Sequence, residues 1–194
     1  LDELPVSELP EIAFVGRSNA GKSTAINALT QQKRLAFASK TPGRTQHINL
    51  FELGPKLAPD ALFADLPGYG YAAVERSKKL RWQQVMADYL EIRRNLAAIV
   101  MLVDSRLGFT ELDTKLLDFV GARLGNGTVK LLVLLTKADK LSRRALDAAL
   151  TGAHDTLAPM IGESAEVGVA PFSALSRQGV EDAALWLHRS VVAP

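Results

Sequence analysis

Short runs of apolar residues alternate with amphipathic stretches along most of the chain. An apolar run bounded by turn residues is typical of a buried strand, whereas apolar residues spaced three and four apart are typical of a helix. The pattern predicts strands over residues 12–15, 47–53, 61–64, 97–103, 130–135 and 169–172. It predicts helices over residues 21–31, around 82–90, and over 110–124, 142–160 and 180–191.

The order of these segments predicts a single sheet covered by helices. Strands that are apolar on both faces and alternate with helices favour a mainly parallel sheet. Gly54-Pro55 and Pro59 interrupt the chain between two neighbouring strands, which indicates a hairpin and an antiparallel edge strand. We therefore expect an α/β fold of three layers: a mostly parallel six-stranded sheet with one antiparallel edge strand, and helices on both faces. Ligands of such sheets bind at the carboxyl ends of the strands.

Composition narrows the protein class without assigning a function. A chain of 194 residues fits one domain over residues 1–194. The absence of Cys excludes disulfides and Cys-ligated zinc and agrees with a reducing cytoplasm, where we expect this protein. No apolar run reaches the length of a membrane span, so no membrane partner is expected. The net charge of +2 permits a nucleic-acid partner but does not predict one.

The strongest motif is Gly-Arg-Ser-Asn-Ala-Gly-Lys-Ser at residues 16–23. Glycines at these positions let the backbone N–H groups curl around phosphate oxygens, and the following helix adds partial positive charge. Lys22 would reach the β- and γ-phosphates, and the Ser23 hydroxyl would bind Mg²⁺. The alternative, a Gly-rich turn with a surface lysine, fits less well between a predicted strand and a predicted helix. The predicted phosphate-binding residues are Gly16, Arg17, Ser18, Asn19, Ala20, Gly21, Lys22, Ser23 and Thr24.

A second motif, Asp65-Leu66-Pro67-Gly68, follows a predicted strand. A carboxylate there can hold Mg²⁺ through water, and Gly68 offers a backbone N–H to a γ-phosphate. The alternative is a plain strand-to-turn exit, since Asp, Pro and Gly are common turn residues. Because this motif follows the 16–23 motif in the same domain, the functional interpretation is favoured. It assigns four residues to the nucleotide site: Asp65, Leu66, Pro67 and Gly68.

Two further motifs point to guanine. Thr136-Lys137-Ala138-Asp139 follows an apolar strand, and its carboxylate can accept hydrogen bonds from two guanine N–H groups that adenine lacks. The lysine stem can cover the face of the base. Phe172-Ser173-Ala174 follows the last strand, where the N–H of Ala174 can reach the guanine carbonyl oxygen. The alternatives are a helix-start Asp beside a solvated Lys, and Ser173 as the N-cap of a helix.

The loop Thr41-Pro42-Gly43-Arg44-Thr45 is a candidate for a segment that responds to the nucleotide. A Thr there can bind Mg²⁺ through its hydroxyl and the γ-phosphate through its N–H. Thr41 and Thr45 both fit this role. Thr45 is preferred because it adjoins the following strand.

The five motifs, in this order, resemble those of Ras-like P-loop GTPases. The particular residues within them resemble the EngB family (also called YsxC or YihA) of bacterial ribosome-biogenesis GTPases. The most discriminating segment is Asp-Leu-Pro-Gly-Tyr-Gly at residues 65–70. The resemblance implies one G domain that binds GTP, GDP and Mg²⁺. It also implies a role in assembly of the large ribosomal subunit, with a linked role in cell division and septation. The implied partners are that subunit or its precursor, through rRNA and ribosomal proteins, and the chain is expected to be a monomer.

The resemblance assigns roles to matching positions. Lys22, Thr45 and Gly68 would act in hydrolysis, and Ser23, Thr45 and Asp65 would hold the metal. The loop after the first helix would contribute Gly43, Arg44, Thr45, Gln46 and His47 to the nucleotide site. The base would be bound by Thr136, Lys137, Ala138, Asp139, Phe172, Ser173 and Ala174.

Departures from the wider GTPase pattern predict weak binding and slow turnover. Thr136 replaces the usual Asn, and Leu175 replaces a Lys that would cover the base. Tyr69 stands where many GTPases carry a Gln that orients the attacking water, so intrinsic hydrolysis of the order of ~10⁻⁴–10⁻³ s⁻¹ is expected. Asn19 either holds K⁺ beside the phosphates or makes local backbone hydrogen bonds.

Basic residues near the helix around 82–90 leave two interpretations open: rRNA binding in the GTP form, or a solvated charged face. They are Arg76, Lys78, Lys79, Arg81, Arg93 and Arg94. An alternative to a hydrolase is a nucleotide-gated rRNA-binding or ribosome-binding module whose hydrolysis is incidental. An ATP-dependent kinase is disfavoured by the 136–139 motif.

Overall fold

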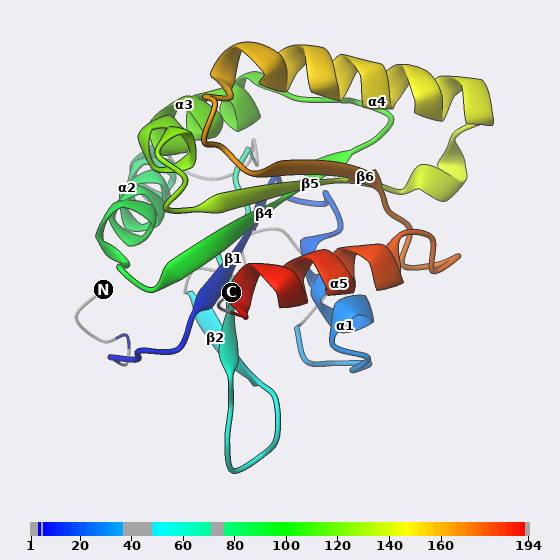
Figure 1. Cartoon of the computed structure of the whole chain (residues 1–194). Helices are drawn as coiled ribbons and strands as arrows, with labels where there is room; N and C mark the ends of the chain where they lie inside the picture. The colour runs from blue at the N-terminus through cyan, green and yellow to red at the C-terminus, as the bar shows by residue number, and fades with distance from the viewer. Residues whose placement is uncertain (1–3, 5, 37–47, 71–75, 193–194) are drawn as a thin grey trace.

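The computed structural model describes residues 4, 6–36, 48–70 and 76–192. Its centre is one six-stranded sheet in the order β2-β3-β1-β4-β5-β6 (Figure 1). The strands are β1 (Glu11–Gly16), β2 (Asn49–Leu53), β3 (Ala61–Asp65), β4 (Leu96–Asp104), β5 (Lys130–Thr136) and β6 (Val167–Pro171). All neighbours pair in parallel except β2, which pairs antiparallel with β3 at the edge. The sheet predicted from the hydrophobic pattern is therefore observed, hairpin included.

The helices cover both faces of this sheet (Figure 1). They are α1 (Lys22–Leu29), α2 (Arg76–Ile92), α3 (Glu111–Gly125), α4 (Arg143–Leu157) and α5 (Val180–Val191), with two short 3₁₀ turns, η1 (Ala138–Lys140) and η2 (Ala158–Met160). One apolar cluster joins the sheet to α1 and α5, and the other joins it to α2, α3 and α4. No described helix is both long enough and apolar enough to span a membrane.

The largest difference from the predicted boundaries lies at α2, which begins at Arg76 and not near residue 82, because its first turns carry few apolar residues to mark a helix. Smaller differences lie at β6 and α4. β6 begins two residues earlier than expected, at Val167, because its partly buried edge position gives a weaker apolar signal than the central strands. The chain leaves α4 after Leu157, and Pro159 lies in the separate turn η2. By contrast, α5 has the predicted bounds, since its apolar positions repeat regularly between Gly179 and the chain end. Trp186 on this helix is half-buried against the core. The side chain of Trp82 lies outside the described residues.

A buried ionic group fixes α2 to the start of β1. Glu11 is fully buried, and its carboxylate accepts hydrogen bonds from the Arg93 Nη2 at 2.5 Å, the Arg93 Nε at 3.0 Å and the Tyr89 hydroxyl at 2.5 Å. Burial raises the pKa of Glu11, but the bonds from Arg93 and Tyr89 outweigh that effect, so the pKa lies below its ordinary value. Arg93 is thus an internal partner and not part of an exposed basic face.

Candidate functional site

The loop after β1 curls tightly at the carboxyl edge of the sheet. Asn19 and Gly21 adopt left-handed backbone angles, with φ of 66° and 93°. Gly16 packs so closely on β4 that a Cβ there would lie 2.9 Å from the Leu102 carbonyl oxygen, so only glycine fits. The loop then enters α1 at Lys22, which leaves the first N–H groups of that helix available to an anion.

An ion pair between Lys22 and Asp65 lies beside this loop. Lys22 begins α1 and Asp65 ends β3, and their side chains form a buried ion pair, 8% and 4% exposed respectively. Ser23, the next residue of α1, is half-buried. This arrangement provides an ammonium group for phosphate, and a hydroxyl and a carboxylate for a cation.

The chain after Asp65 is bound to the same loop by main-chain hydrogen bonds. Ser18 N donates to the Tyr69 carbonyl at 2.8 Å, and Tyr69 N donates to the Gly16 carbonyl at 3.2 Å. Gly68 lies directly against this loop, since a Cβ there would lie 3.3 Å from Ser18 N. The 65–68 motif and the 16–23 motif are therefore adjacent, because they follow neighbouring parallel strands that end at the same edge of the sheet.

The side chain of Tyr69 is buried and bound to α3. Its side chain is only 7% exposed, and its hydroxyl donates to Asp113 Oδ1 on α3 at 2.5 Å. Burial, followed by the charge of Asp113, raises the pKa of the Tyr69 hydroxyl, which therefore remains a protonated donor. From the sequence, Tyr69 is notable only because it replaces a water-orienting Gln, and the bond to Asp113 is not predicted.

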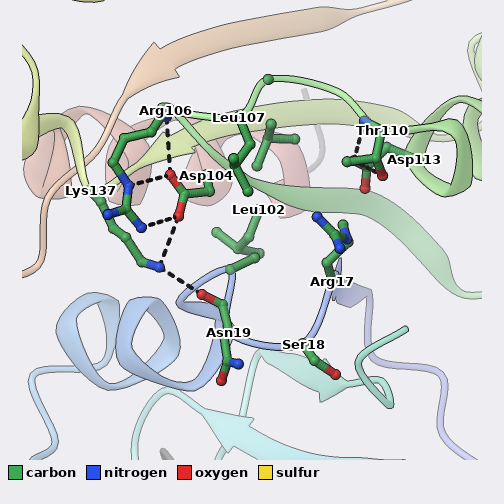
Figure 2. A pocket seen from close by; sticks show the side chains of 13 residues that line it. Arg17, Ser18, Asn19, Leu102, Asp104, Arg106, Leu107, Thr110, Asp113 and Lys137 are labelled. Atoms are coloured by element: carbon green, nitrogen blue, oxygen red, sulfur yellow. Dashed lines mark hydrogen bonds and ion pairs between the residues drawn. The ribbon is translucent and has the colours of Figure 1, made fainter. Parts of the chain in front are cut away.

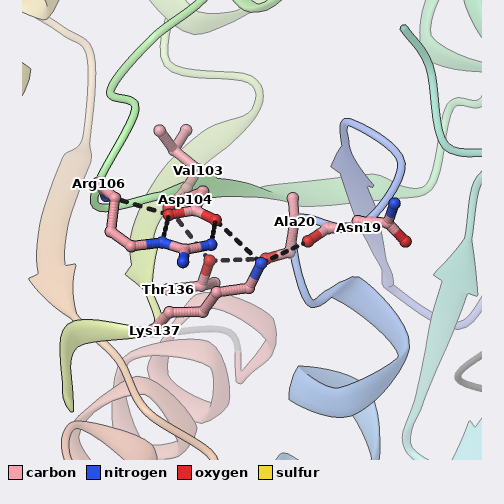
Figure 3. Close-up of polar contacts among 7 residues, drawn as sticks. All are labelled: Asn19, Ala20, Val103, Asp104, Arg106, Thr136 and Lys137. Atoms are coloured by element: carbon pink, nitrogen blue, oxygen red, sulfur yellow. Dashed lines mark hydrogen bonds and ion pairs between the residues drawn. The ribbon is translucent and has the colours of Figure 1, made fainter. Parts of the chain in front are cut away.

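The loop after β5 is fastened to the backbone of the loop after β1 (Figure 3). The Thr136 hydroxyl donates to the Ala20 carbonyl at 2.6 Å and lies 3.2 Å from the Val103 carbonyl. Lys137 Nζ donates to the Asn19 carbonyl at 2.8 Å and to Asp104 Oδ2 at 2.9 Å. Two successive residues of the proposed base-reading motif thus hold two successive carbonyls of the phosphate-binding motif.

Asp104 and Arg106 also belong to this cluster, and neither residue is among those predicted from the motifs. Asp104 ends β4, and Arg106 donates to its two carboxylate oxygens from Nε at 3.0 Å and from Nη2 at 2.8 Å. Burial raises the pKa of Asp104, but the bonds from Arg106 and Lys137 outweigh it and lower the pKa overall. The available signal was a carboxylate directly after an apolar strand, the same signal that identified Asp65.

Asp139 is tied to the loop after β6. The Ser173 hydroxyl donates to Asp139 Oδ1 at 2.6 Å, and Ala138 N donates to the Phe172 carbonyl at 3.1 Å. The bond from Ser173 lowers the pKa of Asp139. The alternative of Ser173 as a helix N-cap is wrong, because α5 begins only at Val180, after Gly179. The neighbouring Leu175 is 80% exposed, so its side chain lies largely in solvent.

A cavity of about 240 Å³ lies between the loop after β1 and the segment after β4. In Figure 2, Arg17 and Thr110 lie on one side of this cavity, and the cluster of Asp104, Arg106 and Lys137 lies on the other. The Asn19 side chain is exposed and forms no hydrogen bond with any described residue. The suggested local hydrogen bonds of Asn19 therefore have no counterpart in this part of the structure.

Several predicted residues lie outside the described part of the chain. They are Thr41, Gly43, Arg44, Thr45, Gln46 and His47, and the side chains of Arg76, Lys78 and Lys79 are not described either. Thr24 is described and exposed. Within the described ranges, no three His, Cys, Asp or Glu side chains gather as a metal site. A cation here would take most of its ligands from hydroxyls, water and phosphate oxygens, which is the usual mode of Mg²⁺.

Comparison with known proteins supports the class that the fold and this edge suggest. The family model described as "50S ribosome-binding GTPase" matches residues 11–137. A crystal structure of "a probable GTP-binding protein engB" superposes with a TM-score of 0.73 at 21% identity and covers 93% of this chain and 98% of that one. A crystal structure of "Era in complex with MgGDPNP and nucleotides 1506-1542 of 16S ribosomal RNA" superposes with a TM-score of 0.74 at 20% identity, and the match covers 96% of this chain and 58% of that one. The chain is therefore a Ras-like G domain, a GTPase that binds guanine nucleotide.

Sequence relatives define the family more narrowly. A "Probable GTP-binding protein EngB" from Acidovorax ebreus is 61% identical over 96% of this chain and 83% of its own length. Its counterpart from Albidiferax ferrireducens is 60% identical over 95% of this chain and 87% of its own length. The chain belongs to the EngB family of GTP-binding proteins.

Proposed function

We propose that this protein is a slowly hydrolysing, Mg²⁺-dependent GTP switch that assists assembly of the large ribosomal subunit, with a linked role in cell division and septation. Nucleotide binding is supported by the hydrogen bonds that connect three motifs at one edge of the sheet. Thr136 and Lys137 hold the backbone of the phosphate-binding loop, and Asp139 is held by Ser173.

Guanine recognition rests on Asp139. Its Oδ1 accepts the Ser173 hydroxyl, which orients the carboxylate, and its lowered pKa keeps it ionised as an acceptor. An ionised carboxylate accepts both N–H groups on one edge of guanine, whereas adenine would leave it without that pair of donors. The Ala174 N–H would bind the guanine carbonyl, and the Lys137 stem would cover the base.

Phosphate binding rests on the loop after β1 and on Lys22. The Lys22 ammonium would exchange Asp65 for the β- and γ-phosphates, and Asp65 would then face the metal. Bound Mg²⁺ would supply charge neutralisation at the phosphates, with Ser23, Thr45 and Asp65 as the protein groups that hold it. The residues fit such a metal, because a hydroxyl and a single carboxylate lie beside the phosphate-binding loop.

Slow hydrolysis follows from the orientation of Tyr69. Its hydroxyl is occupied by Asp113, so this residue offers no group to orient the attacking water. Lys22, Thr45 and the Gly68 N–H remain to stabilise the transferred phosphoryl group. Each tenfold acceleration by a partner would require about 1.4 kcal/mol of additional transition-state stabilisation. K⁺ held by Asn19 would be one source, and equal turnover in K⁺ and Na⁺ would exclude it.

A ribosomal partner is supported by the description of the matching family model, "50S ribosome-binding GTPase", and by the RNA-bound relative Era. The Era complex holds 16S RNA, from the small subunit, whereas the family description names the large one. The family description covers the chain at the level of sequence, so we favour the large subunit. Basic residues of α2 and of the segment directly after it, namely Arg76, Lys78, Lys79, Arg81 and Arg94, would contact rRNA phosphates.

The nucleotide assignment is tested with Asp139→Asn. The amide places an N–H donor where guanine also donates, so affinity for GDP should fall at least about 100-fold, while affinity for xanthosine diphosphate should rise. Asp147→Asn, on the exposed face of α4, is the matched control and should change neither. Calorimetric titration with GDP, ADP and xanthosine diphosphate measures both effects. Equal affinity of the unaltered protein for GDP and ADP would contradict the proposal.

The ribosomal assignment is tested by co-sedimentation with isolated large and small subunits in the presence of GDP or a non-hydrolysable GTP analogue. Binding should favour the large subunit in the analogue-bound state and weaken as salt rises. Charge reversal at Lys78 and Lys79 should reduce it. Turnover measured with and without subunits separates the switch from the alternative, a binding module whose hydrolysis is incidental. Stimulation favours the switch, and unchanged turnover with intact binding favours the module.

A further inference from the structure

Tyr69 connects the phosphate-binding loop to α3 through both its backbone and its side chain. Its backbone exchanges hydrogen bonds with Gly16 and Ser18 at 3.2 and 2.8 Å. Its hydroxyl donates to Asp113 at 2.5 Å, 44 positions further along the chain. Gly68, whose N–H would meet a γ-phosphate, directly precedes this doubly held residue. The position of that N–H therefore depends on where Tyr69 is anchored.

The anchor on α3 is itself rigidly held. Asp113 is 1% exposed and lies in the first turn of the helix. Its Oδ2 accepts both the Thr110 N–H and the Thr110 hydroxyl at 2.8 Å, which closes a capping box, and its Oδ1 remains for Tyr69. Figure 2 shows Thr110 and Asp113 together beside the cavity that Arg17 also lines. Every oxygen of this buried carboxylate has a donor, so its orientation is fixed.

We infer that Tyr69 and Asp113 form a positioning pair, which holds the Gly68 N–H against the phosphate-binding loop and thereby sets the preference of the site for a triphosphate over a diphosphate. The inference rests on the proposed function, because it assumes that the nucleotide lies in that loop. In the proposed site the pair would contact neither the base nor the α- and β-phosphates. Loss of the Tyr69–Asp113 bond should therefore affect only the interaction that distinguishes GTP from GDP.

The chain offers an internal control for this pair. Tyr89 is also buried, and its hydroxyl also donates to a buried carboxylate, Glu11, at 2.5 Å. That second pair lies at the opposite edge of the sheet, where β1 begins. Tyr69→Phe and Tyr89→Phe each remove one hydroxyl and leave one carboxylate with a missing donor. They should cost comparable stability but should differ at the nucleotide site.

The experiment measures the affinity of the full chain for a non-hydrolysable GTP analogue and for GDP, together with thermal unfolding. Tyr69→Phe should weaken analogue binding about tenfold, the effect of one hydrogen bond to a charged group, and should change GDP binding less than about twofold. Tyr89→Phe should lower the unfolding temperature but leave the ratio of the two affinities unchanged. Such a result would support the positioning role and exclude general destabilisation.

A second pair of variants guards against failure of Tyr69→Phe to fold. Thr110→Val removes one donor to Asp113 and should lower the analogue-to-GDP affinity ratio about threefold, while Thr110→Ser keeps the hydroxyl and should restore it. An unchanged ratio in Tyr69→Phe and Thr110→Val would overturn the inference, and so would an equal loss of both nucleotides. Failure of the unaltered protein to bind either nucleotide would instead overturn the proposed function.

Discussion

The side chains of Lys22 and Asp65 show how a buried charge depends on one partner. Both side chains are nearly excluded from water. Among the described residues, each forms its ion pair with the other. Removal of one partner from a buried pair leaves an uncompensated charge, whereas removal of both is close to neutral. The same lysine is the proposed phosphate ligand. Variants of this pair can therefore separate the effect on folding stability from the effect on nucleotide binding.

Lys22→Met should lower the free energy of unfolding by about 3 kcal/mol, because the Asp65 charge stays buried without a partner. It should also abolish measurable GDP binding. Adding Asp65→Asn should restore most of the stability but none of the binding. Urea unfolding and calorimetric titration measure the two quantities. Retained GDP binding in Lys22→Met would remove Lys22 from the phosphate site.

At the scale of elements, glycines show where the backbone geometry of a connection is strict. Gly179 precedes α5 with φ of 72°, and a Cβ there would lie 2.1 Å from the Pro171 carbonyl oxygen. Gly152 lies inside α4 with nothing within 4 Å of the place its Cβ would take. The first glycine is required by the turn that carries Ser173, and the second is not required by packing.

Gly179→Ala should destabilise the protein by at least about 2 kcal/mol, since it combines backbone strain with a clash against main-chain oxygen. Gly152→Ala should stabilise it by about 0.5–1 kcal/mol through helix propensity. Chemical denaturation of the two variants measures both values. A loss of stability in Gly152→Ala would contradict the open space beside Gly152.

The anchor between α2 and β1 gives a pH-dependent prediction. The pKa of Glu11 is lowered in the folded state, so its contribution to stability is present above its ordinary value of 4.5 and is lost as the pH falls through the folded value. Arg93→Met should remove about 3 kcal/mol at pH 7, and less as the pH falls below 4.5, where protonation relieves the buried charge. Arg94→Met, which changes the exposed residue next to Arg93, is the control. Urea unfolding across this pH range measures the effect, and a pH-independent loss would contradict it.

At the scale of the whole molecule, ligand binding should stabilise the folded state by mass action. GDP with Mg²⁺ at 100 times its dissociation constant should add about 2.7 kcal/mol. For a chain of this size that corresponds to a rise of roughly 5–10 °C in the unfolding temperature. ADP at the same concentration should produce little change. A thermal scan with each nucleotide measures it, and equal shifts would argue against guanine selection.

The sequence predicted the elements better than the contacts among them. The apolar strands and the order of motifs were enough to define the sheet and the edge at which the motifs meet. Asp104 and Arg106 were missed because their importance comes from Lys137, a residue that is distant in the sequence and near in the fold. Tyr69 was interpreted only by what it replaces, since no local pattern reveals that Asp113 has a free oxygen facing it. The role of Thr45 stays a prediction.

The bonds from Thr136 and Lys137 to the Ala20 and Asn19 carbonyls have a kinetic consequence. Any motion that opens the proposed guanine-binding motif must also disturb the backbone of the proposed phosphate-binding loop. Departure of the nucleotide should accordingly occur as one concerted event, with a single exponential phase. A factor that accelerates exchange could act from either end of the ligand and reach the other through two hydrogen bonds.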